Sequence, residues 1–184
     1  MITRIATKSD IEEILQLQAL NLQGNLSSAE LSDGFVTTPI TVEQIKTILV
    51  QQGLFVVEQN DRVAGYAYAG SWDYFFQWKI FPYMLSRLTQ ISFNGQTINK
   101  NNSFQYGPVC ITKSLRGSGA FPQLFTTMRS SLAKTYPIGI TFINQINQRS
   151  LKAHQKLNLK IVDEFGFNQN KYYSLAFLTK VESL

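Results

Sequence analysis

The sequence has few of the residues that small proteins use for cross-links and metal sites. Among its 184 residues there are one cysteine, Cys110, one histidine and five prolines. A single cysteine cannot form an intramolecular disulfide, and one cysteine with one histidine argues against a structural zinc site. We therefore expect a protein without a metal that is compatible with a reducing, cytoplasmic compartment.

Long apolar runs and clusters of like charge are also missing. No stretch approaches the apolar length of about 20 residues that a membrane span needs, and the start Met-Ile-Thr-Arg-Ile lacks the apolar core of a signal peptide. Apolar residues make up 44% of the chain and charged residues 16%, which favours one folded domain over residues 1–184. The net charge of +5 suggests an anionic ligand or a solvated basic surface. Without a Lys/Arg run, we expect neither nucleic acid nor membrane as a partner.

A basic glycine turn stands out among the residues that are present. Residues 108–122 read Pro-Val-Cys-Ile-Thr-Lys-Ser-Leu-Arg-Gly-Ser-Gly-Ala-Phe-Pro, which predicts a strand end, a turn and a helix start. Such a turn directs backbone N–H groups at one spot, where the helix N-terminus adds positive potential, so a phosphate fits. Taken alone, a turn of this kind is more often plain topology. Neither a P-loop nor a Gly-x-Gly-x-x-Gly fingerprint is present, since Phe121 and Pro122 interrupt the latter.

A second stretch, Asn147 to Lys160, follows the apolar strand Ile138–Ile143. Together the two stretches resemble motifs A and B of the GNAT superfamily of acetyl-coenzyme A-dependent N-acetyltransferases. Arg116 and Gly119 match motif A, and Phe121 departs from it. In motif B four residues match in register, while His154 stands where tyrosine is usual and Asn158-Leu159 where Gly-Phe is usual. The four matching residues are Asn147, Ser150, Lys156 and Leu157.

The predicted order of elements agrees with this resemblance. Capping boxes at Ser9–Glu12, Ser27–Glu30 and Thr41–Gln44 predict helices, the first with Ile11, Ile14, Leu15 and Leu22 on one face, and Gly24–Ile40 is a turn-rich loop. The predicted strands are Ile2–Ala6, Leu54–Glu58, Val63–Ala69, Phe104–Ile111, Ile138–Asn144, Leu159–Phe165 and Lys171–Leu178. Helices are predicted at Phe121–Lys134 and Gln148–Leu157. The resemblance implies an α/β fold with a mixed sheet and one splayed parallel strand pair.

The resemblance also implies which residues bind the coenzyme. Backbone groups of Val109, Cys110 and Ile111 would bond to the pantetheine arm, although a buried strand explains these residues as well. The turn would bind the pyrophosphate through Arg116, Gly117, Ser118, Gly119, Ala120 and Phe121. Asn147 would hold the pantetheine, or it would only cap a helix. Lys113, Arg149 and Lys152 are candidates for the ribose phosphate or are solvated charges.

His154 takes the position of the tyrosine that protonates the leaving thiolate in the family. Imidazole, with an ordinary pKa near 6.5, can serve there, so His154 is the candidate catalytic residue. The alternative is that it is packed or exposed without a role. The sequence does not identify the general base: Glu58 and Asp73 are candidates, and a chain of water molecules could replace both. We interpret Cys110 as an apolar strand residue rather than a nucleophile that carries the acyl group.

An aromatic-rich insert occupies about residues 70–103. Phe76, Ile80, Tyr83, Met84 and Leu88 fit one helical face with Pro82 bending or delaying the helix, and Phe93-Asn-Gly-Gln fits a tight turn. Most of its aromatic residues fit a hydrophobic core. A wall of the acceptor-substrate pocket is an alternative role for Trp72 and Tyr74, and a dimer face is a further alternative for the insert. Tyr106, which precedes the thioester region, is also a candidate substrate residue.

These observations predict an acetyl-coenzyme A-dependent N-acetyltransferase that transfers the acetyl group directly to an amine. The acceptor would be a small-molecule or peptide amine, and a homodimer is compatible with the sequence. The alternative is a non-catalytic module of the same fold that binds acyl-coenzyme A, which the departures at Phe121, Pro122 and His154 keep open.

Overall fold

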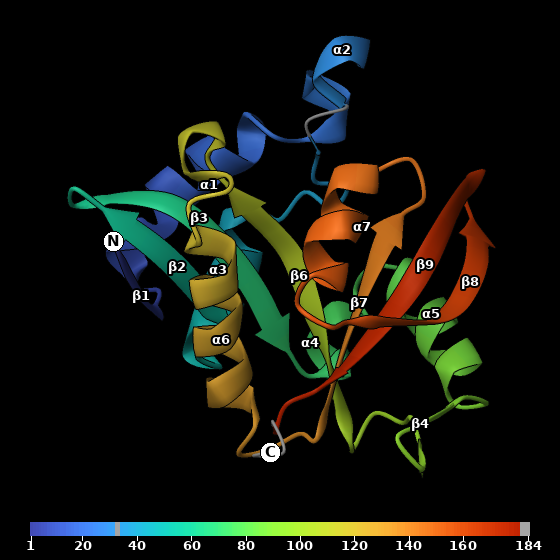
Figure 1. Ribbon diagram of the computed structural model, residues 1–184. Coiled ribbons are helices and arrows are strands. Elements are labelled where there is room, and N and C mark those ends of the chain that lie inside the picture. Colours follow the sequence, from blue (N-terminus) through green and yellow to red (C-terminus); the bar gives the residue numbers. More distant parts are fainter. Residues whose placement is uncertain (32–33, 181–184) are drawn as a thin grey trace. The chain divides into compact units, whose positions relative to one another are not determined.

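The computed structural model (Figure 1) describes residues 1–31 and 34–180 in two compact units. Unit 1 comprises Met1–Ala69 and Gly107–Met128, and unit 2 comprises Gly70–Tyr106 and the chain from Arg129 onward. Residues 32–33, within the predicted loop Gly24–Ile40, lie outside the described residues. The assignment of residues 1–184 to one domain stays a prediction.

Three antiparallel strands form the sheet of unit 1 together with the end of a fourth. β1 (Ile2–Ile5) pairs with β2 (Leu54–Gln59), which pairs with β3 (Arg62–Gly70). The turn between β2 and β3 has positive φ at Asn60 and Asp61, 53° and 58°, as two-residue hairpins require. The predicted hairpin is therefore confirmed. The end of β6 (Ser103–Ile111) joins this sheet, where Thr112 N–H donates to the carbonyl of Ala64.

Helices lie on both faces of the unit 1 sheet (Figure 1): α1 (Ile11–Ala19) and α3 (Val42–Val50) on one face, and α6 (Ala120–Leu132) on the other. The hydroxyls of Thr3 and Thr127, 2.7 Å apart, join β1 to α6. Arg4, the next residue, points to the opposite face because successive side chains of a strand alternate. Short helical turns in the described part of the unit are η1 (Lys8–Asp10), η2 (Gln23–Asn25), α2 (Ser28–Leu31) and η3 (Lys113–Leu115).

The predicted capping box at Thr41–Gln44 is confirmed, and at Ser27–Glu30 one half of the predicted box is present, the bond from the Ser27 N–H to the Glu30 side chain. Gln44 N–H donates to the Thr41 hydroxyl, and Glu30 accepts from the N–H and hydroxyl of Ser27. The first box was predicted two residues too late, because it is formed by Thr7 and Asp10 around η1. The following helix α1 ends at Ala19, so Leu22 lies beyond it rather than on its apolar face.

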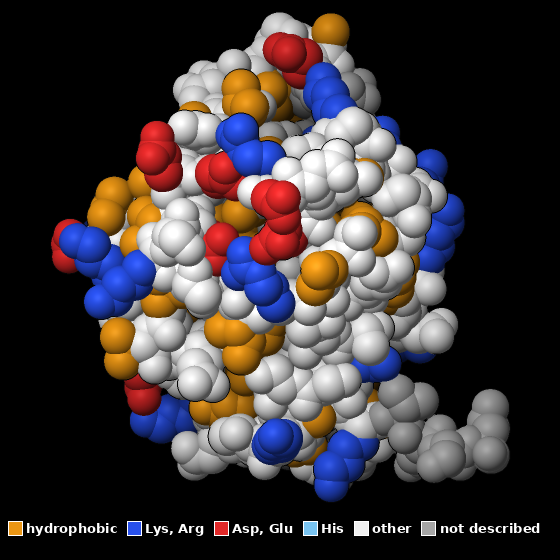
Figure 2. Space-filling model, turned by 90° about the vertical axis from the view of Figure 1, so that its left-hand side faces the viewer, with side chains coloured by type: hydrophobic (Ala, Val, Ile, Leu, Met, Phe, Trp, Pro, Cys, Tyr) orange, Lys and Arg blue, Asp and Glu red, His pale blue; other side chains and the backbone are white. Residues whose placement is uncertain are grey.

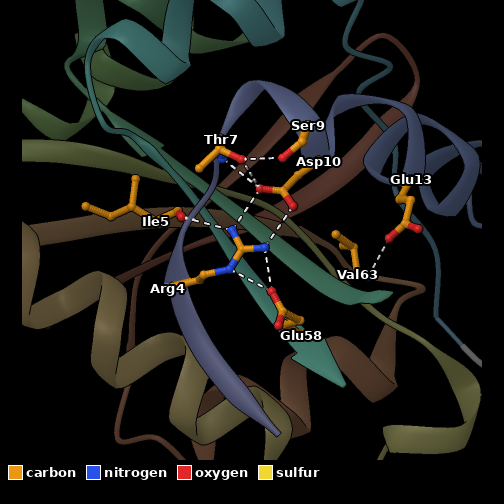
Figure 3. Close-up of polar contacts among 8 residues, drawn as sticks. All are labelled: Arg4, Ile5, Thr7, Ser9, Asp10, Glu13, Glu58 and Val63. Carbon is orange, nitrogen blue, oxygen red and sulfur yellow. Dashed lines mark hydrogen bonds and ion pairs between the residues drawn. The ribbon is translucent and has the colours of Figure 1, made fainter. Parts of the chain in front are cut away.

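An ionic cluster fixes the start of α1 against the sheet (Figure 3). The Arg4 guanidinium donates to both Asp10 oxygens, at 2.8 and 2.9 Å, and its Nε donates to Glu58 at 2.8 Å. The hydrogen bonds from Arg4 hold the pKa of the nearly buried Asp10 below its usual value. Glu13 accepts from the backbone N–H of Val63 at 2.6 Å. The cluster therefore connects β1, β2, β3 and α1.

Unit 2 is built on the other part of β6 and three further strands. Ser103, Phe104 and Gln105 pair in parallel with β7 (Ile138–Asn144), β7 pairs antiparallel with β9 (Asn170–Leu178), and β9 pairs antiparallel with β8 (Lys160–Phe167). The hydrogen-bonded order of the whole sheet is β1-β2-β3-β6-β7-β9-β8. The predicted mixed sheet with a parallel pair at β6 and β7 is confirmed.

Gly139 in β7 permits tight packing inside unit 2. A Cβ atom placed there would clash with the ring of Phe177 on the neighbouring strand β9. Phe177 in turn packs edge-on against Phe104 and Tyr106 of β6. One glycine thus lets an aromatic row cross three strands on the face that α7 (Gln148–Gln155) covers (Figure 1).

The insert covers the opposite face of the unit 2 sheet (Figure 1). It contains α4 (Trp72–Phe75), α5 (Ile80–Leu88) and the small hairpin of β4 (Ser92–Phe93) and β5 (Gln96–Thr97). Phe81 on α5 packs edge-on against Phe142 of β7 at 5.5 Å, and Arg87 bonds Asp163 of β8 at 2.6 Å. The predicted turn after Phe93 is confirmed.

The predicted apolar face of the insert helix was partly wrong. Phe81, Met84, Leu85 and Leu88 are buried, whereas Phe76 and Tyr83 are 38% and 40% exposed. The prediction placed Phe76 and the residues up to Leu88 on one face of a single helix. The chain instead forms two helices, and Pro82 lies in the first turn of the second, where proline is tolerated.

Candidate functional site

The glycine turn in unit 1 has a backbone conformation that other residues rarely adopt. Gly117 and Gly119 have φ angles of 85° and 91°, and a Cβ at either would meet no atom within 4 Å. The requirement for glycine is therefore conformational, and the space around both residues is open. The strand β6 and the short helix η3 (Lys113–Leu115) lead into this turn.

Helix α6 starts directly after the turn. Its first backbone bond of the α-helical type runs from Gln123 N–H to the carbonyl of Gly119. The N–H groups of the first turn of α6 precede the helix's own repeating bonds and carry the positive end of the helix dipole. Pro122 supplies no N–H, which leaves Ala120 and Phe121 as the helical donors of the first turn. The turn and the helix start can together bind an anion such as a phosphate.

Arg116 opens the turn, but its side chain makes bonds inside unit 1. Its Nε donates to the carbonyl of Ile111 at 3.1 Å, and its Nη2 donates to Oδ1 of Asn21 at 3.0 Å. The motif match had assigned Arg116 to the coenzyme. These contacts support a role in holding the turn, and no sequence signal had pointed to Asn21.

The strand residues that precede the turn differ in burial. Val109 is half-buried, whereas Cys110 and Ile111 are buried. Burial raises the pKa of the Cys110 thiol to about 12, so the thiolate needed for acyl transfer is scarce at neutral pH. This supports the interpretation of Cys110 as an apolar strand residue.

Asn147 is the N-cap of α7 in unit 2. Its Oδ1 accepts from the N–H of Ser150 at 3.2 Å, and its side chain is buried. The capping role that the sequence left open is therefore present, and it fixes the start of the helix that carries His154. Arg149 and Lys152 on the same helix are exposed, as is Lys113 in unit 1.

His154 is buried, 3% exposed, on the face of α7 that covers the sheet. Its Nδ1 lies 2.7 Å from the carbonyl oxygen of Ser150, one helical turn earlier. A carbonyl only accepts, so this contact places the ring proton on Nδ1 and leaves Nε2 as the nitrogen with the lone pair. Burial lowers the pKa of His154 to about 4, although the bond to Ser150 opposes that shift. The imidazole is thus neutral at pH 7.

Tyr106 packs beside this histidine within unit 2. The two ring centroids are 5.6 Å apart, and Tyr106 is fully buried at the last β6 position of the unit. Burial raises the pKa of Tyr106 well above its usual value, so the phenol keeps its proton at neutral pH. The neighbouring Gln105 donates from Nε2 to the carbonyl of Tyr106 at 2.7 Å, which supplies that carbonyl with a side-chain donor.

The two insert residues proposed for the substrate wall lie in the core of unit 2. Trp72 is 1% exposed and donates from Nε1 to the Ser103 hydroxyl at 3.0 Å. Tyr74 is 5% exposed and packs edge-on against Phe75 at 4.9 Å. These contacts favour the core role that the sequence analysis left open, and their contact with substrate stays a prediction.

The structure also bears on the candidate general bases. Glu58 accepts hydrogen bonds from Arg4 in the cluster of Figure 3, so its carboxylate already has a partner, whereas Asp73 is exposed on α4. Acidic and basic side chains are interspersed on the molecular face in Figure 2, so the net positive charge is not gathered there.

Within residues 1–31 and 34–180, no group of three potential metal ligands occurs. None of the helices in that range is long and apolar enough to cross a membrane.

The predicted site residues thus fall into two groups. Val109, Cys110, Ile111 and residues 116–121 lie together in unit 1, at the end of β6 and the start of α6. In unit 2, Tyr106 and His154 are in ring contact, and Asn147 caps the helix of the histidine.

Comparison with solved structures shows the fold. An N-acetyltransferase from Staphylococcus aureus Mu50 has a TM-score of 0.64 at 22% identity, covering 97% of this chain and 98% of that one. A putative acetyltransferase, yncA from Salmonella typhimurium, was solved with acetyl-CoA and has a TM-score of 0.64 at 14% identity, covering 100% and 96%. A GNAT family acetyltransferase from Streptococcus pneumoniae has a TM-score of 0.63 at 14% identity, covering 96% and 98%. No family model and no curated protein matches the sequence. The chain has the fold of GNAT acetyltransferases.

Proposed function

We propose that this protein is an acetyl-coenzyme A-dependent N-acetyltransferase, acting in the cytoplasm on a small-molecule or peptide amine. The observation that carries the proposal is the glycine turn, with Gly117 and Gly119 at positive φ, which opens into the N-terminus of α6. The proposal is supported by the place of this turn, which follows β6 and η3 in a chain with the fold of acetyltransferases, because a turn that leads into a helix N-terminus suits a phosphate.

The coenzyme would be bound mainly by backbone groups. N–H groups of Gly117, Gly119, Ala120 and Phe121 would bond to the pyrophosphate, whereas the N–H of Ser118 donates to the carbonyl of Leu115 within the turn. Arg116 would hold the turn in place through Ile111 and Asn21. Backbone groups of Val109, Cys110 and Ile111 would bond to the pantetheine arm like an added strand. Asn147 would contact the arm while it caps α7.

In the proposed reaction the acceptor amine attacks the thioester carbonyl carbon directly. A C–N bond forms, the C–S bond breaks, and the sulfur leaves with the bonding electron pair. The amine nitrogen then gives up one proton, which ends on the departing sulfur to give the free coenzyme A thiol or passes to solvent water. Because a thiol has a pKa near 8.5, its thiolate is a good leaving group and needs little acid assistance.

The geometry of His154 supports a different part in this reaction from that of an acid. Its proton is on Nδ1 and is donated to Ser150, so Nε2 can accept a hydrogen bond but has none to donate. We propose that His154 acts as a hydrogen-bond acceptor at the reaction centre. Tyr106, a neutral phenol beside it, keeps a proton that it can donate.

The second candidate function is a non-catalytic acyl-coenzyme A-binding module of the same fold. The neutral, buried His154 favours it, because an acid at this position is what the family resemblance would require.

Two measurements on the whole chain separate these functions. Titration calorimetry with coenzyme A and acetyl-coenzyme A tests binding, and thiol release from acetyl-coenzyme A across a panel of amines tests catalysis. An acetyltransferase binds both ligands and releases thiol faster with some amine. Binding without amine-stimulated release would identify the binding module, and no binding would contradict both functions.

A further inference from the structure

Arg116 joins the glycine turn to a distant part of unit 1. The planar guanidinium donates from Nε to Ile111, the last residue of β6, and from Nη2 to Oδ1 of Asn21, 95 positions earlier in the chain. Two donors of one rigid fork therefore fix the turn to the strand before it and to the segment that follows α1.

Asn21 is the point at which several elements meet. It is 8% exposed, its Nδ2 donates to the carbonyl of Leu17 in α1 at 2.9 Å, and its own N–H donates to Gln18 at 3.0 Å. Its carbonyl accepts from the N–H of Val36 at 2.8 Å, and Gln23 N–H donates to the carbonyl of Val36 at 2.9 Å. Asn21 therefore receives Arg116 through its side chain and bonds to Val36 through its backbone carbonyl. That backbone bond joins the two ends of a segment whose described residues are 21–31 and 34–36.

Between its two bonded ends, the described part of this segment has few buried residues that would stabilise it. Neither η2 (Gln23–Asn25) nor α2 (Ser28–Leu31) has a buried residue, whereas Phe35 and Val36 at the far end are buried. A stretch with few buried contacts opens at low free-energy cost, so the bonds at Asn21 and Val36 govern how often it does so.

We propose that Arg116 is a positioning residue that couples the glycine turn through Asn21 to the described segment, residues 21–31 and 34–36, so that a ligand bound at the turn stabilises these residues. The proposal rests on the proposed function in one respect, because the ligand is taken to be the pyrophosphate of coenzyme A. A phosphate bonded to the turn fixes the backbone of Arg116. The guanidinium then holds Asn21 in place, because the buried amide would otherwise lose a bonding partner. Because such a coupling is reciprocal, coenzyme binding at the turn and an ordered segment favour each other.

The chain offers a matched set of variants. Arg116→Met keeps most of the side-chain length but removes both donors, and Asn21→Ala removes the acceptor. Asn25→Ala is the control, because Asn25 lies in the same segment and donates to the carbonyl of Ala19 at 2.8 Å, on the exposed surface.

Hydrogen–deuterium exchange of each protein, with and without coenzyme A, tests the coupling. In the parent and in Asn25→Ala, coenzyme A should slow exchange both in residues 116–123 and in residues 21–31 and 34–36. In Arg116→Met and Asn21→Ala, protection should remain in the turn and be lost in the segment, with the Kd for coenzyme A weakened about five- to tenfold. Segment protection that persists in both variants, or that is missing in the parent while its turn is protected, would overturn the coupling.

The coenzyme-free proteins give a reading that does not depend on the proposed function. Exchange at Arg116 and Ser118, whose N–H groups bond to Lys113 and Leu115, should be faster in Asn21→Ala than in the parent and in Asn25→Ala. Equal rates in Asn21→Ala and Asn25→Ala would refute the connection, whether or not the parent binds coenzyme A. Faster exchange with no coenzyme binding would support the connection and refute only the proposed function.

Discussion

The glycine turn of unit 1 and the His154 region of unit 2 are sites of opposite kinds. The turn has open space around Gly117 and Gly119 and offers backbone N–H groups, whose chemistry does not depend on burial. His154 and Tyr106 are buried side chains, and their proton affinities differ from those of the free groups because of that burial. The backbone conformation of the turn therefore follows from its glycines, which the sequence displays. The protonation states of His154 and Tyr106 follow from their packing, which the sequence does not display.

The largest effect that tests this difference concerns His154. His154→Phe should lower kcat by roughly ten- to a thousandfold while leaving the Kd for coenzyme A nearly unchanged, because the ring would fill the space without accepting a hydrogen bond. Steady-state kinetics with the best amine from the panel, beside calorimetry, makes the measurement.

Two further substitutions at this position separate an acceptor from an acid. His154→Gln supplies an amide oxygen that accepts, so it should retain more activity than His154→Phe. His154→Tyr supplies a good donor and should retain less than His154→Gln. The reverse order would show that a donor is needed and that the Nδ1 bond to Ser150 breaks during turnover.

The second effect is on stability against pH, and its sign follows from the same histidine. The pKa of His154 is about 4 in the folded chain against an ordinary 6.5. Between these values the unfolded chain binds a proton that the folded chain does not, so the free energy of unfolding falls as pH drops from 6.5 to 4. The loss should reach roughly 3 kcal/mol, and urea unfolding at several pH values measures it.

Controls for the pH effect are available within the chain. His154→Phe should lack this dependence of unfolding free energy on pH. Asp10 cannot produce the same effect: because its pKa is lowered in the folded chain, its contribution to stability is lost only as the pH falls below 3.8, the ordinary pKa of the group. Since His154 is the only histidine, its ring nitrogen resonances report the titration directly. A midpoint near 6.5, or a proton on Nε2, would contradict the buried neutral state.

Most of the fold was predictable because it follows from local patterns. The hairpin at Asn60-Asp61 and the box at Thr41 are each specified by neighbouring residues, and the structure confirms them. The box assigned to Ser9 failed because Thr7 and Asp10 satisfy the same spacing, and Asp10 is held by Arg4, which is itself fixed by Glu58, 54 positions further along the chain. Long-range partners decide between equivalent local solutions, and a single sequence does not display them.

The third effect tests the turn. Gly119→Val should weaken the binding of acetyl-coenzyme A tenfold or more, about 1.4 kcal/mol, because a β-branched residue disfavours the φ of 91° and adds bulk where the phosphate would approach. Gly95→Val is the matched control, since Gly95 also has positive φ, 75°, and open space, but lies in the β4–β5 hairpin. Calorimetry on both variants makes the comparison. Equal affinity in a folded Gly119→Val protein would refute the phosphate assignment.

The candidate site was only partly predictable for the same physical reason. Gly117, Gly119 and Asn147 were identified because turns and caps require particular residue types. The tautomer of His154 depends on a bond to the Ser150 carbonyl, which any residue at that position would supply. The partner of Arg116, Asn21, had no signal because the bond joins residues far apart in the chain.

The smallest effect concerns the insert. It tests whether the buried aromatic residue Trp72, like His154, owes its properties to packing inside unit 2. Trp72→Phe keeps a ring in the core but removes the N–H that bonds to Ser103 at 3.0 Å, so the free energy of unfolding should fall by about 1 kcal/mol. The acceptor KM should stay unchanged, because Trp72 is 1% exposed and packed rather than open to a ligand. Phe76→Ala is the comparison, since Phe76 belongs to the same insert but is 38% exposed, and it should change stability little. Urea unfolding and steady-state kinetics on both variants decide the matter. A changed acceptor KM in Trp72→Phe at unchanged stability would place Trp72 against the acceptor and restore the substrate role that its burial argues against.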